Sequence, residues 1–386
     1  MAPQRLVIIG GGPAGLAAAR GYRDAGGDGD VTLIAAEPHL PYRRPPLTKE
    51  FLRGELARTE LALEQASWFA EHSVDLRLGT RAEAIDPEGG AVRLSDGQTV
   101  AAEACVLATG SRPQRLPVPG ADDENVLEIR LLSDSERLID RAREATSAVV
   151  IGSGFIGCEA AASLAMRGLE VTLVTVERVP QIDRLGRDAG ERIAGWLREV
   201  GVTLILEAEV KEIEDARRVH VASGPKLDAD IVVLATGVVP NGELAAAIGL
   251  ELHDGAVPVD ASMRSENPFL SAAGDVASAL NPSAGRRLRV EHWGDALAQG
   301  EIAGRALAGE PAEWDEVPGF WSTIGAYTLK YAAWGDGFDE DRLVDYGDGA
   351  FTVWYSQGGV AVGVLTHERD EDYERGRELI ARGVRM

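Results

Sequence analysis

One arrangement occurs twice in this chain: an apolar strand, a glycine loop, a helix and a second apolar strand. In the first copy, an apolar run over 6–9 leads into Gly-Gly-Gly-Pro-Ala-Gly at 10–15. In the second copy, the run over 148–151 leads into Gly-Ser-Gly-Phe-Ile-Gly at 152–157. Two β-α-β units so far apart predict two nucleotide-binding domains rather than one continuous sheet.

Each copy is followed later in the chain by an apolar strand that ends at a proline break. Two apolar strands end in Thr-Gly and are soon followed by Pro113 or Pro240, which marks the exits of the two domains. After Gly237 we expect the chain to return to the first domain. The expected helices cover 16–24, 158–166, 293–308 and 370–382, and the expected strands cover 31–34, 106–108, 171–174, 232–235, 269–275, 352–355 and 360–365, with a Gly358-Gly359 turn between the last two.

These elements predict an α/β fold with two Rossmann-like dinucleotide-binding domains and a small α+β C-terminal domain. The first domain is expected over 1–112 and 238–310. The second is expected over 113–237, and the C-terminal domain over 311–386.

Charge and composition exclude several classes of protein. The net charge of −23 argues against nucleic acid as a partner, because phosphates need a basic face, and it disfavours an anionic membrane. No apolar run approaches the roughly 18 residues needed to span a bilayer, and the short apolar start is no signal peptide. We expect a cytoplasmic protein.

The two cysteines, Cys105 and Cys158, form no C-x-x-C pair. A disulfide framework and a zinc ribbon are therefore excluded, and buried structural thiols are expected. No His/Cys cluster predicts a metal site, and no G-x-S-x-G predicts a hydrolase.

The glycines of the loops have separate mechanical roles. Gly10 makes a tight turn, Gly12 lets the backbone approach a pyrophosphate, and Gly15 lets helix and strand pack closely. Pro13 and Ala14 belong to the same loop, and the N-terminus of the helix that follows offers N–H groups to phosphate. The second loop has the same pattern, so its predicted binding residues are Gly152, Gly154, Phe155, Ile156 and Gly157.

Two such domains predict two dinucleotides. The sensible pair is a tightly held flavin, FAD, and a diffusing nicotinamide, NAD(P)H. A flavin takes a hydride and releases single electrons, whereas a nicotinamide delivers only hydrides.

Three further segments resemble one family. Pro-Tyr-Arg-Arg-Pro-Pro-Leu-Thr-Lys at 41–49, Val-Glu-His-Trp at 290–293 and Phe-Trp-Ser at 320–322 are similar to segments of the FAD-dependent ferredoxin reductases. These reductases serve oxygenases and cytochromes P450, and apoptosis-inducing factor is a relative. The resemblance covers nearly the whole chain in the right order.

The resemblance implies three catalytic residues: Lys49, Glu159 and Trp293. Lys49 would pair with Glu159 near flavin N5, where an ammonium stabilises charge developing on the ring. Trp293 would lie against the isoalloxazine, with a helix N-terminus near N1. His292 is more naturally a spacer than a base, because hydride transfer needs no general base.

The resemblance also implies the remaining cofactor contacts. Asp275, after Gly274, matches the Gly-Asp that binds the ribityl chain and adjoining phosphate. Guanidinium groups suit phosphate. The other predicted binding residues are Ala36, Glu37, Arg44, Ala82, Thr109, Gly110, Arg130, Glu177, Gly237, Glu291 and His292.

The chain departs from the family where ribose is recognised. Ala36 stands where the family has an acid for the FAD ribose, and Glu37 is the neighbouring candidate. Thr175 stands where NADH-preferring members have an acid, with Glu177 two residues later and Arg178 able to attract a 2′-phosphate. The choice between NADH and NADPH therefore stays open.

The expected function is an FAD-dependent NAD(P)H reductase that passes electrons to a ferredoxin-like iron–sulfur protein, as monomer or homodimer. No cysteine near Lys49 could relay electrons, so the disulfide reductases of this superfold are disfavoured. An NAD(P)H oxidase or small-molecule reductase, and a redox-gated binding protein like apoptosis-inducing factor, are the alternatives. Despite the overall negative charge, a partner could dock on either of two basic groups. One consists of Arg43, Arg44, Lys49, Arg53 and Arg58, and the other of Arg286, Arg287 and Arg289. Thr323 stands where the family often has Asp, so the partner surface departs from the family there.

Overall fold

The computed structural model describes residues 2–222 and 224–386, and these form two compact units. Each unit contains one glycine loop and is assembled from three segments of the chain. Unit 1 consists of Met1–Arg43, Ala62–Arg112 and Val239–Phe320, and unit 2 consists of Arg44–Leu61, Pro113–Val238 and Trp321–Met386.

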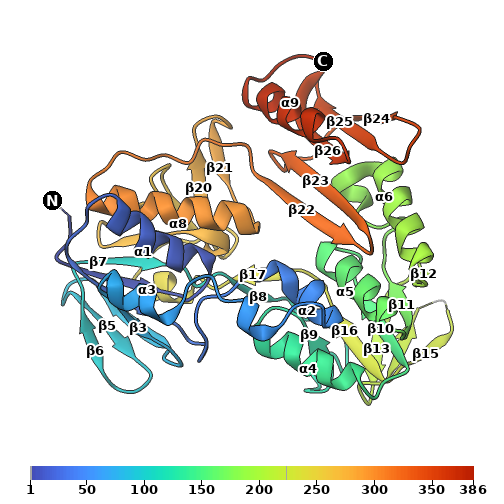
Figure 1. The fold of residues 1–386 in the computed structure, drawn as a ribbon, viewed down its shortest axis with the longest axis horizontal. Coiled ribbons are helices and arrows are strands. Elements are labelled where there is room, and N and C mark those ends of the chain that lie inside the picture. The colour runs from blue at the N-terminus through green and yellow to red at the C-terminus, as the bar shows by residue number, and fades with distance from the viewer. Residues whose placement is uncertain (1, 223) are drawn as a thin grey trace. The chain divides into compact units, whose positions relative to one another are not determined.

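Unit 1 is built on a five-stranded parallel sheet with β1 (Arg5–Ile9) at its centre (Figure 1). From Leu6 to Ile9 the strand is at most 4% exposed, as expected for a parallel sheet covered on both faces. Chain order reverses beside β1, which is where doubly wound sheets bind ligands. The strand order is β19 (Leu270–Ala272), β7 (Ala104–Leu107), β1, β2 (Asp30–Ile34) and β3 (Val74–Arg77).

Two long helices of unit 1 pack against each other through glycines. They are α1 (Pro13–Asp24) and α8 (Trp293–Ala308), which lie side by side in Figure 1. A Cβ on Gly300 would lie 2.2 Å from Ala14 O, and one on Gly304 2.1 Å from Ala18 O. The two helix axes can approach this closely only because these positions carry no side chain.

The rest of unit 1 consists of short elements. Two small antiparallel or mixed sheets and several single-turn helices complete it, and β8 and β17 carry the chain between the units. Their bounds are α3 (Ala66–Glu71), β4 (Ala82–Asp86), β5 (Ala91–Leu94), β6 (Thr99–Ala101), β8 (Ser111–Pro113), β17 (Val238–Pro240), α7 (Glu243–Ala247), β18 (Val257–Val259), η3 (Gly274–Val276), β20 (Ala277–Asn281) and β21 (Arg286–Leu288).

Unit 2 repeats the parallel sheet. Its order is β12 (Thr203–Ile205), β11 (Glu170–Val174), β10 (Ser147–Ile151), β16 (Ile231–Leu234) and β9 (Leu127–Glu128). The helices of this half are α2 (Glu50–Arg53), α4 (Leu132–Ala142), α5 (Phe155–Met166) and α6 (Ile182–Glu199), with the single turns η1 (Pro45–Thr48) and η2 (Arg58–Glu60).

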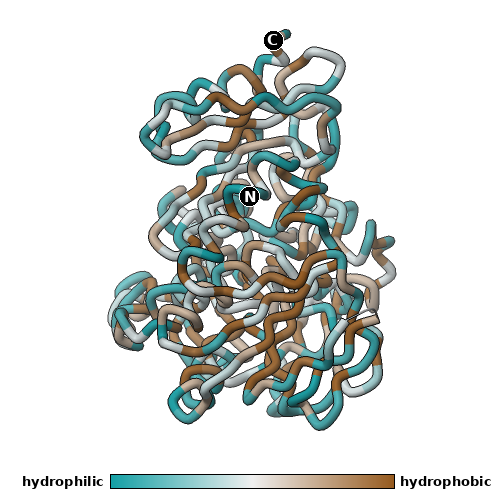
Figure 2. The backbone as a smooth tube through the Cα atoms, turned by 90° about the vertical axis from the view of Figure 1, so that its right-hand side faces the viewer, coloured by the Kyte–Doolittle hydropathy of each residue, from teal (hydrophilic) through white to brown (hydrophobic). Residues whose placement is uncertain are grey.

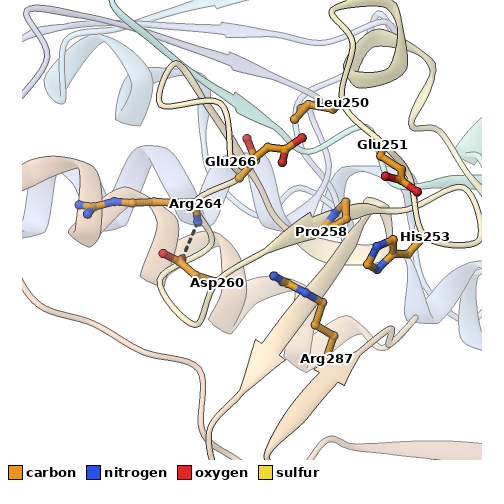
Figure 3. A pocket seen from close by; sticks show the side chains of 9 residues that line it. Leu250, Glu251, His253, Pro258, Asp260, Arg264, Glu266 and Arg287 are labelled. Atoms are coloured by element: carbon orange, nitrogen blue, oxygen red, sulfur yellow. Dashed lines mark hydrogen bonds between the residues drawn. The ribbon is translucent and has the colours of Figure 1, made fainter.

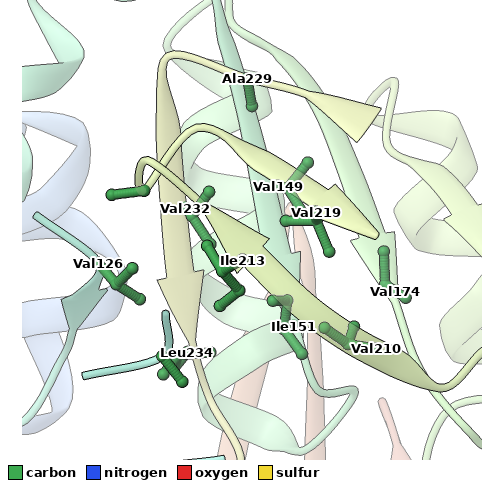
Figure 4. Close-up of a cluster of buried hydrophobic side chains, with 12 residues drawn as sticks. Val126, Val149, Ile151, Val174, Val210, Ile213, Val219, Ala229, Val232 and Leu234 are labelled. Carbon is green, nitrogen blue, oxygen red and sulfur yellow. The ribbon is translucent and has the colours of Figure 1, made fainter. Parts of the chain in front are cut away.

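A three-stranded antiparallel sheet covers one face of this parallel sheet. It consists of β13 (Val210–Glu214), β14 (Arg218–Val221) and β15 (Lys226–Asp228). Figure 4 shows how Ile213 and Val219 meet side chains of β10 and β16 in a buried aliphatic cluster. The apolar strands of the second glycine-loop unit thus have a core of their own.

Unit 2 ends in a five-stranded antiparallel sheet with a helix packed on it. Its order is β22 (Gly319–Ile324), β23 (Tyr327–Ala333), β26 (Val360–His367), β25 (Phe351–Gln357) and β24 (Glu340–Asp345), followed by α9 (Asp370–Ala381).

The α/β fold class with two dinucleotide-binding sheets is confirmed, and the predicted hairpin around Gly358 is present. Helix α8 has the predicted bounds, and α1 and α5 begin three residues earlier than expected, directly after the loop glycine. The strand expected over 269–275 is shorter, because Gly274 adopts φ +76° and turns the chain.

In Figure 2 the long hydrophobic stretches of the tube alternate with hydrophilic loops. No helix within 2–222 and 224–386 has the length and hydropathy to cross a membrane.

Candidate functional site

The first glycine loop is fixed by contacts with the chain itself. Gly10 follows β1 and has φ +127°, and a Cβ there would lie 2.1 Å from Ala108 O. A Cβ on Gly15 would lie 1.9 Å from Gly10 O. Both positions therefore admit only glycine, and they send the chain from the strand into α1 by the tightest route.

The second loop repeats these contacts. Gly152 has φ +107° and its Cβ would lie 2.3 Å from Ala235 O, while a Cβ on Gly157 would lie 2.1 Å from Gly152 O. Phe155 and Ile156, which were predicted as part of the loop, form the first turn of α5. The two units thus present the same strand, turn and helix start.

The middle glycines of the loops point to a ligand. Gly154 has φ −62°, which any residue adopts, and a Cβ there would meet no described atom within 4 Å. Gly12, at φ −85°, is equally unstrained. Neither α1 nor α5 has a side-chain N-cap, so their first N–H groups have no such partner. An open, uncapped helix start fits the pyrophosphate of a dinucleotide.

Three predicted FAD-binding segments meet in unit 1. A Cβ on Gly274 would lie 3.1 Å from Ala14 Cβ and 3.4 Å from Ala296 Cβ, so the Gly274-Asp275 tip adjoins the starts of α1 and α8. Asp275 is 8% exposed, and its Oδ2 accepts a hydrogen bond of 2.7 Å from Ser111 Oγ. These are the segments that the resemblance assigned to the flavin.

Sequence analysis missed one residue of this cluster. Gln299 lies on α8, is fully buried, and accepts the Gly274 N–H through Oε1 at 2.9 Å. Its Nε2 has no hydrogen-bond partner among the described residues. A buried amide donor without a partner beside the Gly-Asp tip also fits a bound polar ligand. Nothing in the local sequence distinguishes this glutamine from a surface residue.

Residues Glu291 to Trp293 lead into α8. Trp293 is half-buried as the first residue of the helix, and His292 Nδ1 lies 3.1 Å from Asp295 Oδ2. Glu291 is exposed and forms an ion pair with Arg289 at 3.7 Å. The His292 ring thus has a structural partner in Asp295, in keeping with its expected place as a spacer.

The residues predicted for the adenosine end also lie in unit 1. Ala36 is exposed, while Glu37 is half-buried and its Oε2 accepts 2.7 Å from Tyr42 Oη. The Thr109 hydroxyl donates to Asn241 O at 2.8 Å, and the Thr109 carbonyl accepts from Asn241 Nδ2 at 2.9 Å. Ala82 is buried at the start of β4, and Gly110 has φ +65°.

The predicted Lys49–Glu159 pair is present in unit 2. Lys49 Nζ lies 3.0 Å from Glu159 Oε2, and the two residues are 5% and 6% exposed. Two further donors reach the same carboxylate, Thr48 Oγ1 on Oε2 and Ser322 Oγ on Oε1 at 2.7 Å. Glu159 therefore accepts three hydrogen bonds, which is what a buried carboxylate needs to offset its desolvation.

Helices α4 and α5 hold the Lys49 segment through its backbone carbonyls. Ser163 Oγ donates to Thr48 O at 2.7 Å, and Ser135 Oγ donates to Leu47 O at 2.8 Å. Arg44 Nη1 donates to Arg130 O at 2.8 Å, so these two predicted phosphate-contacting arginines are neighbours. Gly237, at φ +102°, follows β16 in the same unit.

Two expectations about the basic groups are wrong. Lys49 and Arg53 were assigned to an exposed docking patch. Lys49 is buried against Glu159, and the Arg53 side chain is 10% exposed and paired with Glu55 at 2.8 Å. Partner carboxylates satisfy both charges inside unit 2, so neither is available to a docking protein.

Both cysteines are buried single thiols, as predicted. Burial raises the pKa of each thiol well above its usual value, and for Cys158 the carboxylates of Glu159 and Glu177 act in the same direction. Such thiols stay protonated and unreactive near neutral pH. Among the described residues, no group of three or more His, Cys, Asp or Glu side chains could hold a metal ion.

One pocket of about 390 Å³ opens in unit 1, and none of the predicted cofactor-binding residues lines it (Figure 3). Its lining mixes both signs of charge, and Asp260 Oδ1 accepts the Arg264 N–H at 2.9 Å. The lining residues are Leu250, Glu251, His253, Pro258, Asp260, Arg264, Ser265, Glu266 and Arg287.

The paired glycine loops on two doubly wound sheets define a protein that binds two dinucleotides. The model of the pyridine nucleotide-disulphide oxidoreductase family matches residues 4–300, and the chain belongs to that family. It is an oxidoreductase that uses FAD and NAD(P)H.

Individual relatives of this chain are reductases of small electron-transfer proteins. The chain is 35% identical to a rhodocoxin reductase of Rhodococcus erythropolis, over 97% of this chain and 89% of the relative. It is similar to the ferredoxin reductase for the CYP199A2 system from Rhodopseudomonas palustris, with TM-score 0.94, 31% identity and coverage of 99% and 96%. A covalent putidaredoxin reductase-putidaredoxin complex matches with TM-score 0.93, 29% identity and coverage of 99% and 94%. These matches support the resemblance found in the sequence.

Proposed function

We propose that this chain is an FAD-dependent NAD(P)H reductase that passes electrons to a ferredoxin-like iron–sulfur protein. The observation that carries the proposal is the duplicated glycine loop, one in each unit, together with the absence of an accessible thiol. The relatives named for rhodocoxin and putidaredoxin supply the acceptor class. The same reasoning favours a flavoprotein with a protein acceptor over one with a disulfide relay.

The chain's own residues have distinct parts in this proposal. FAD, when bound, accepts a hydride from the nicotinamide and can release single electrons. The first loop and the Gly274-Asp275 tip would hold it, and the N–H groups at the start of α8 would stabilise negative charge on the reduced ring. Lys49 offers a buried ammonium, oriented by its ion pair with Glu159.

Ser322 and Thr48 have a supporting part. They donate to the carboxylate of Glu159. The carboxylate therefore keeps its orientation while the Lys49 ammonium stabilises charge that develops on the flavin ring. Trp293 packs against the ring system in the proposal.

Free, buried thiols are compatible with the cytoplasm as the proposed location. The proposed assembly is a monomer or homodimer, and light scattering coupled to size exclusion distinguishes the two.

The partner would dock near the β20–β21 hairpin. Arg286, Arg287 and Arg289 fall within four residues of sequence, and Arg287 and Arg289 are exposed. Their positive charge offers an acidic ferredoxin a local attraction that the net charge of −23 does not.

The triple variant Arg286→Ala, Arg287→Ala and Arg289→Ala tests this surface. It should raise the KM for a ferredoxin about tenfold, while the KM for ferricyanide changes less than about twofold. A matched variant that replaces exposed Arg93, Arg143 and Arg217 with alanine keeps the same net charge and should change neither KM. Equal effects of the hairpin variant on both acceptors would refute the docking surface.

A further inference from the structure

Ser153, the second residue of the second glycine loop, forms hydrogen bonds with two residues that follow β11, Thr175 and Glu177. Its Oγ donates to Glu177 Oε2, and lies 2.7 Å from Thr175 Oγ1. The Glu177 N–H in turn donates to Thr175 Oγ1 over 3.2 Å. Ser153 and Thr175 are 2% and 5% exposed, so water does not compete for these bonds.

The direction of each hydrogen bond in this set follows from chemistry. An ionised carboxylate has no proton, so Ser153 must donate its only hydroxyl proton to Glu177. Thr175 must then donate to Ser153 Oγ, while its own oxygen accepts the Glu177 N–H. Each group therefore donates in the direction that strengthens the next bond, and the chain of bonds ends on the carboxylate.

Gln181 adds a second restraint on the same oxygen. Its N–H donates to Glu177 Oε2 at 3.1 Å. Gln181 holds φ +64°, a left-handed conformation that is rare for a residue with a side chain, and it is 5% exposed. The conformation places this N–H on Glu177 at the start of α6.

Glu177 consequently keeps one oxygen for a ligand. The hydrogen bonds from Ser153 Oγ and from the Gln181 N–H both end on Glu177 Oε2. Glu177 Oε1 has no hydrogen-bond partner among the described residues. Glu177 is half-buried, and the donors on Oε2 fix the orientation of its carboxylate.

The first unit has no such arrangement. A Cβ on Gly11, the counterpart of Ser153, would lie 2.5 Å from the Cβ of Ala35, the counterpart of Thr175. The hydroxyl pair is therefore a property of the second loop alone.

We propose that Ser153 and Thr175 are positioning residues that fix the Glu177 carboxylate against the 2′-hydroxyl of an adenosine ribose, and so select NADH over NADPH. The inference rests on the proposed function, because it needs the nicotinamide nucleotide at the second loop. A carboxylate accepts a hydrogen bond from a ribose hydroxyl and repels a 2′-phosphate. Restrained by two donors, Ser153 Oγ and the Gln181 N–H, Glu177 cannot turn aside to admit that phosphate.

Calorimetric titration of the holoenzyme with NAD⁺ and with NADP⁺ tests the proposal without turnover. The natural chain should bind NAD⁺ at least about tenfold more tightly than NADP⁺. Ser153→Ala should raise the Kd for NAD⁺ about fivefold and bring the ratio of the two constants toward one, because a hydrogen bond to a charged group is lost. Thr175→Val should act in the same direction, and Thr175→Ser, which keeps the hydroxyl, should restore the natural ratio.

Ser147→Ala is the matched control. Ser147 Oγ also donates to a carboxylate, Asp230 at 3.3 Å, but at the opposite end of β10. This variant should leave both constants unchanged, and equal melting temperatures for all variants show that the fold is intact.

Failure of the proposed function and failure of the NADH selection give different binding results. A natural chain that binds neither nucleotide contradicts the proposed function. A natural chain that binds both equally, or prefers NADP⁺ until Arg178→Ala removes the preference, overturns the selection of NADH. An NAD⁺ preference that Ser153→Ala leaves unchanged overturns the part given to Ser153.

Discussion

The two glycine loops are the same device built twice, and their hydrogen bonds match almost one for one. Gly10 N–H donates to Ile34 O at 2.8 Å, and Gly152 N–H donates to Val174 O at 2.9 Å. The carbonyls of Glu37 and Glu177, just after the second strands, each accept an N–H at 3.0 Å. Backbone geometry is thus conserved between the units wherever the chain makes its turn.

The loops differ in the side chains at the second loop position and just after the second strand. Gly11 and Ala35 in unit 1 are replaced by Ser153 and Thr175 in unit 2. Glu37 accepts from a tyrosine, whereas Glu177 accepts from the serine of its own loop. The fold therefore fixes the first and last glycines, and the ligand sets the residues between them.

The largest expected effect comes from the glycines that the fold requires. Gly10→Ala and Gly152→Ala each force a Cβ onto a carbonyl oxygen at a positive φ, so each should lower the free energy of unfolding by about 3 kcal/mol or more. Urea denaturation measures this loss. Gly195→Ala is the control, because Gly195 is exposed within α6 and a Cβ there would meet no atom within 4 Å in the part of the chain that the structure describes.

The same pair should separate the two cofactors. Gly10→Ala should purify without the yellow flavin absorbance, while Gly152→Ala should keep it and lose nicotinamide binding. Loss of flavin from Gly152→Ala with Gly10→Ala still yellow would reverse the assignment of the loops.

A smaller effect on stability, but a clear one on binding, is expected at Gly154. A Cβ there meets no atom of the described residues within 4 Å, so Gly154→Ala should cost less than about 1 kcal/mol. It should nevertheless weaken NAD⁺ binding at least about tenfold, because the methyl group takes the place of the pyrophosphate. Calorimetry beside a urea titration measures both. Unchanged affinity would show that the loop is open for some other reason.

The smallest effect concerns the thiol in the second loop's helix. Cys158 occupies the position of Leu16 in the first unit, and burial raises the pKa of its thiol. Since a raised pKa keeps the thiol protonated, neither Cys158 nor Cys105 should react with an aromatic disulfide reagent at pH 8 within minutes. Both should react in denaturant. Rapid reaction of the native protein would mean that the start of α5 opens.

Sequence reasoning succeeded where the signal was local. The turn glycines follow from φ and close approach, α8 follows from its apolar spacing, and the pairing of Lys49 with Glu159 came from a resemblance carried by short motifs. It left unassigned the small antiparallel sheets and β24, whose sequence Glu-Asp-Arg-Leu-Val-Asp has an exposed, charged first half. An exposed edge strand of that composition gives no apolar alternation to detect.

The sequence by itself determined that this protein holds two dinucleotide loops and no thiol relay, because glycine spacing and cysteine count need no partner from elsewhere in the chain. Tertiary structure alone decided what surrounds the acids. Ser322 reaches Glu159 across 163 residues of sequence, and Ser153 reaches Glu177 from the loop after β10. Hydrogen bonds between distant segments depend on how the sheets bring those segments together, and no local pattern encodes that distance.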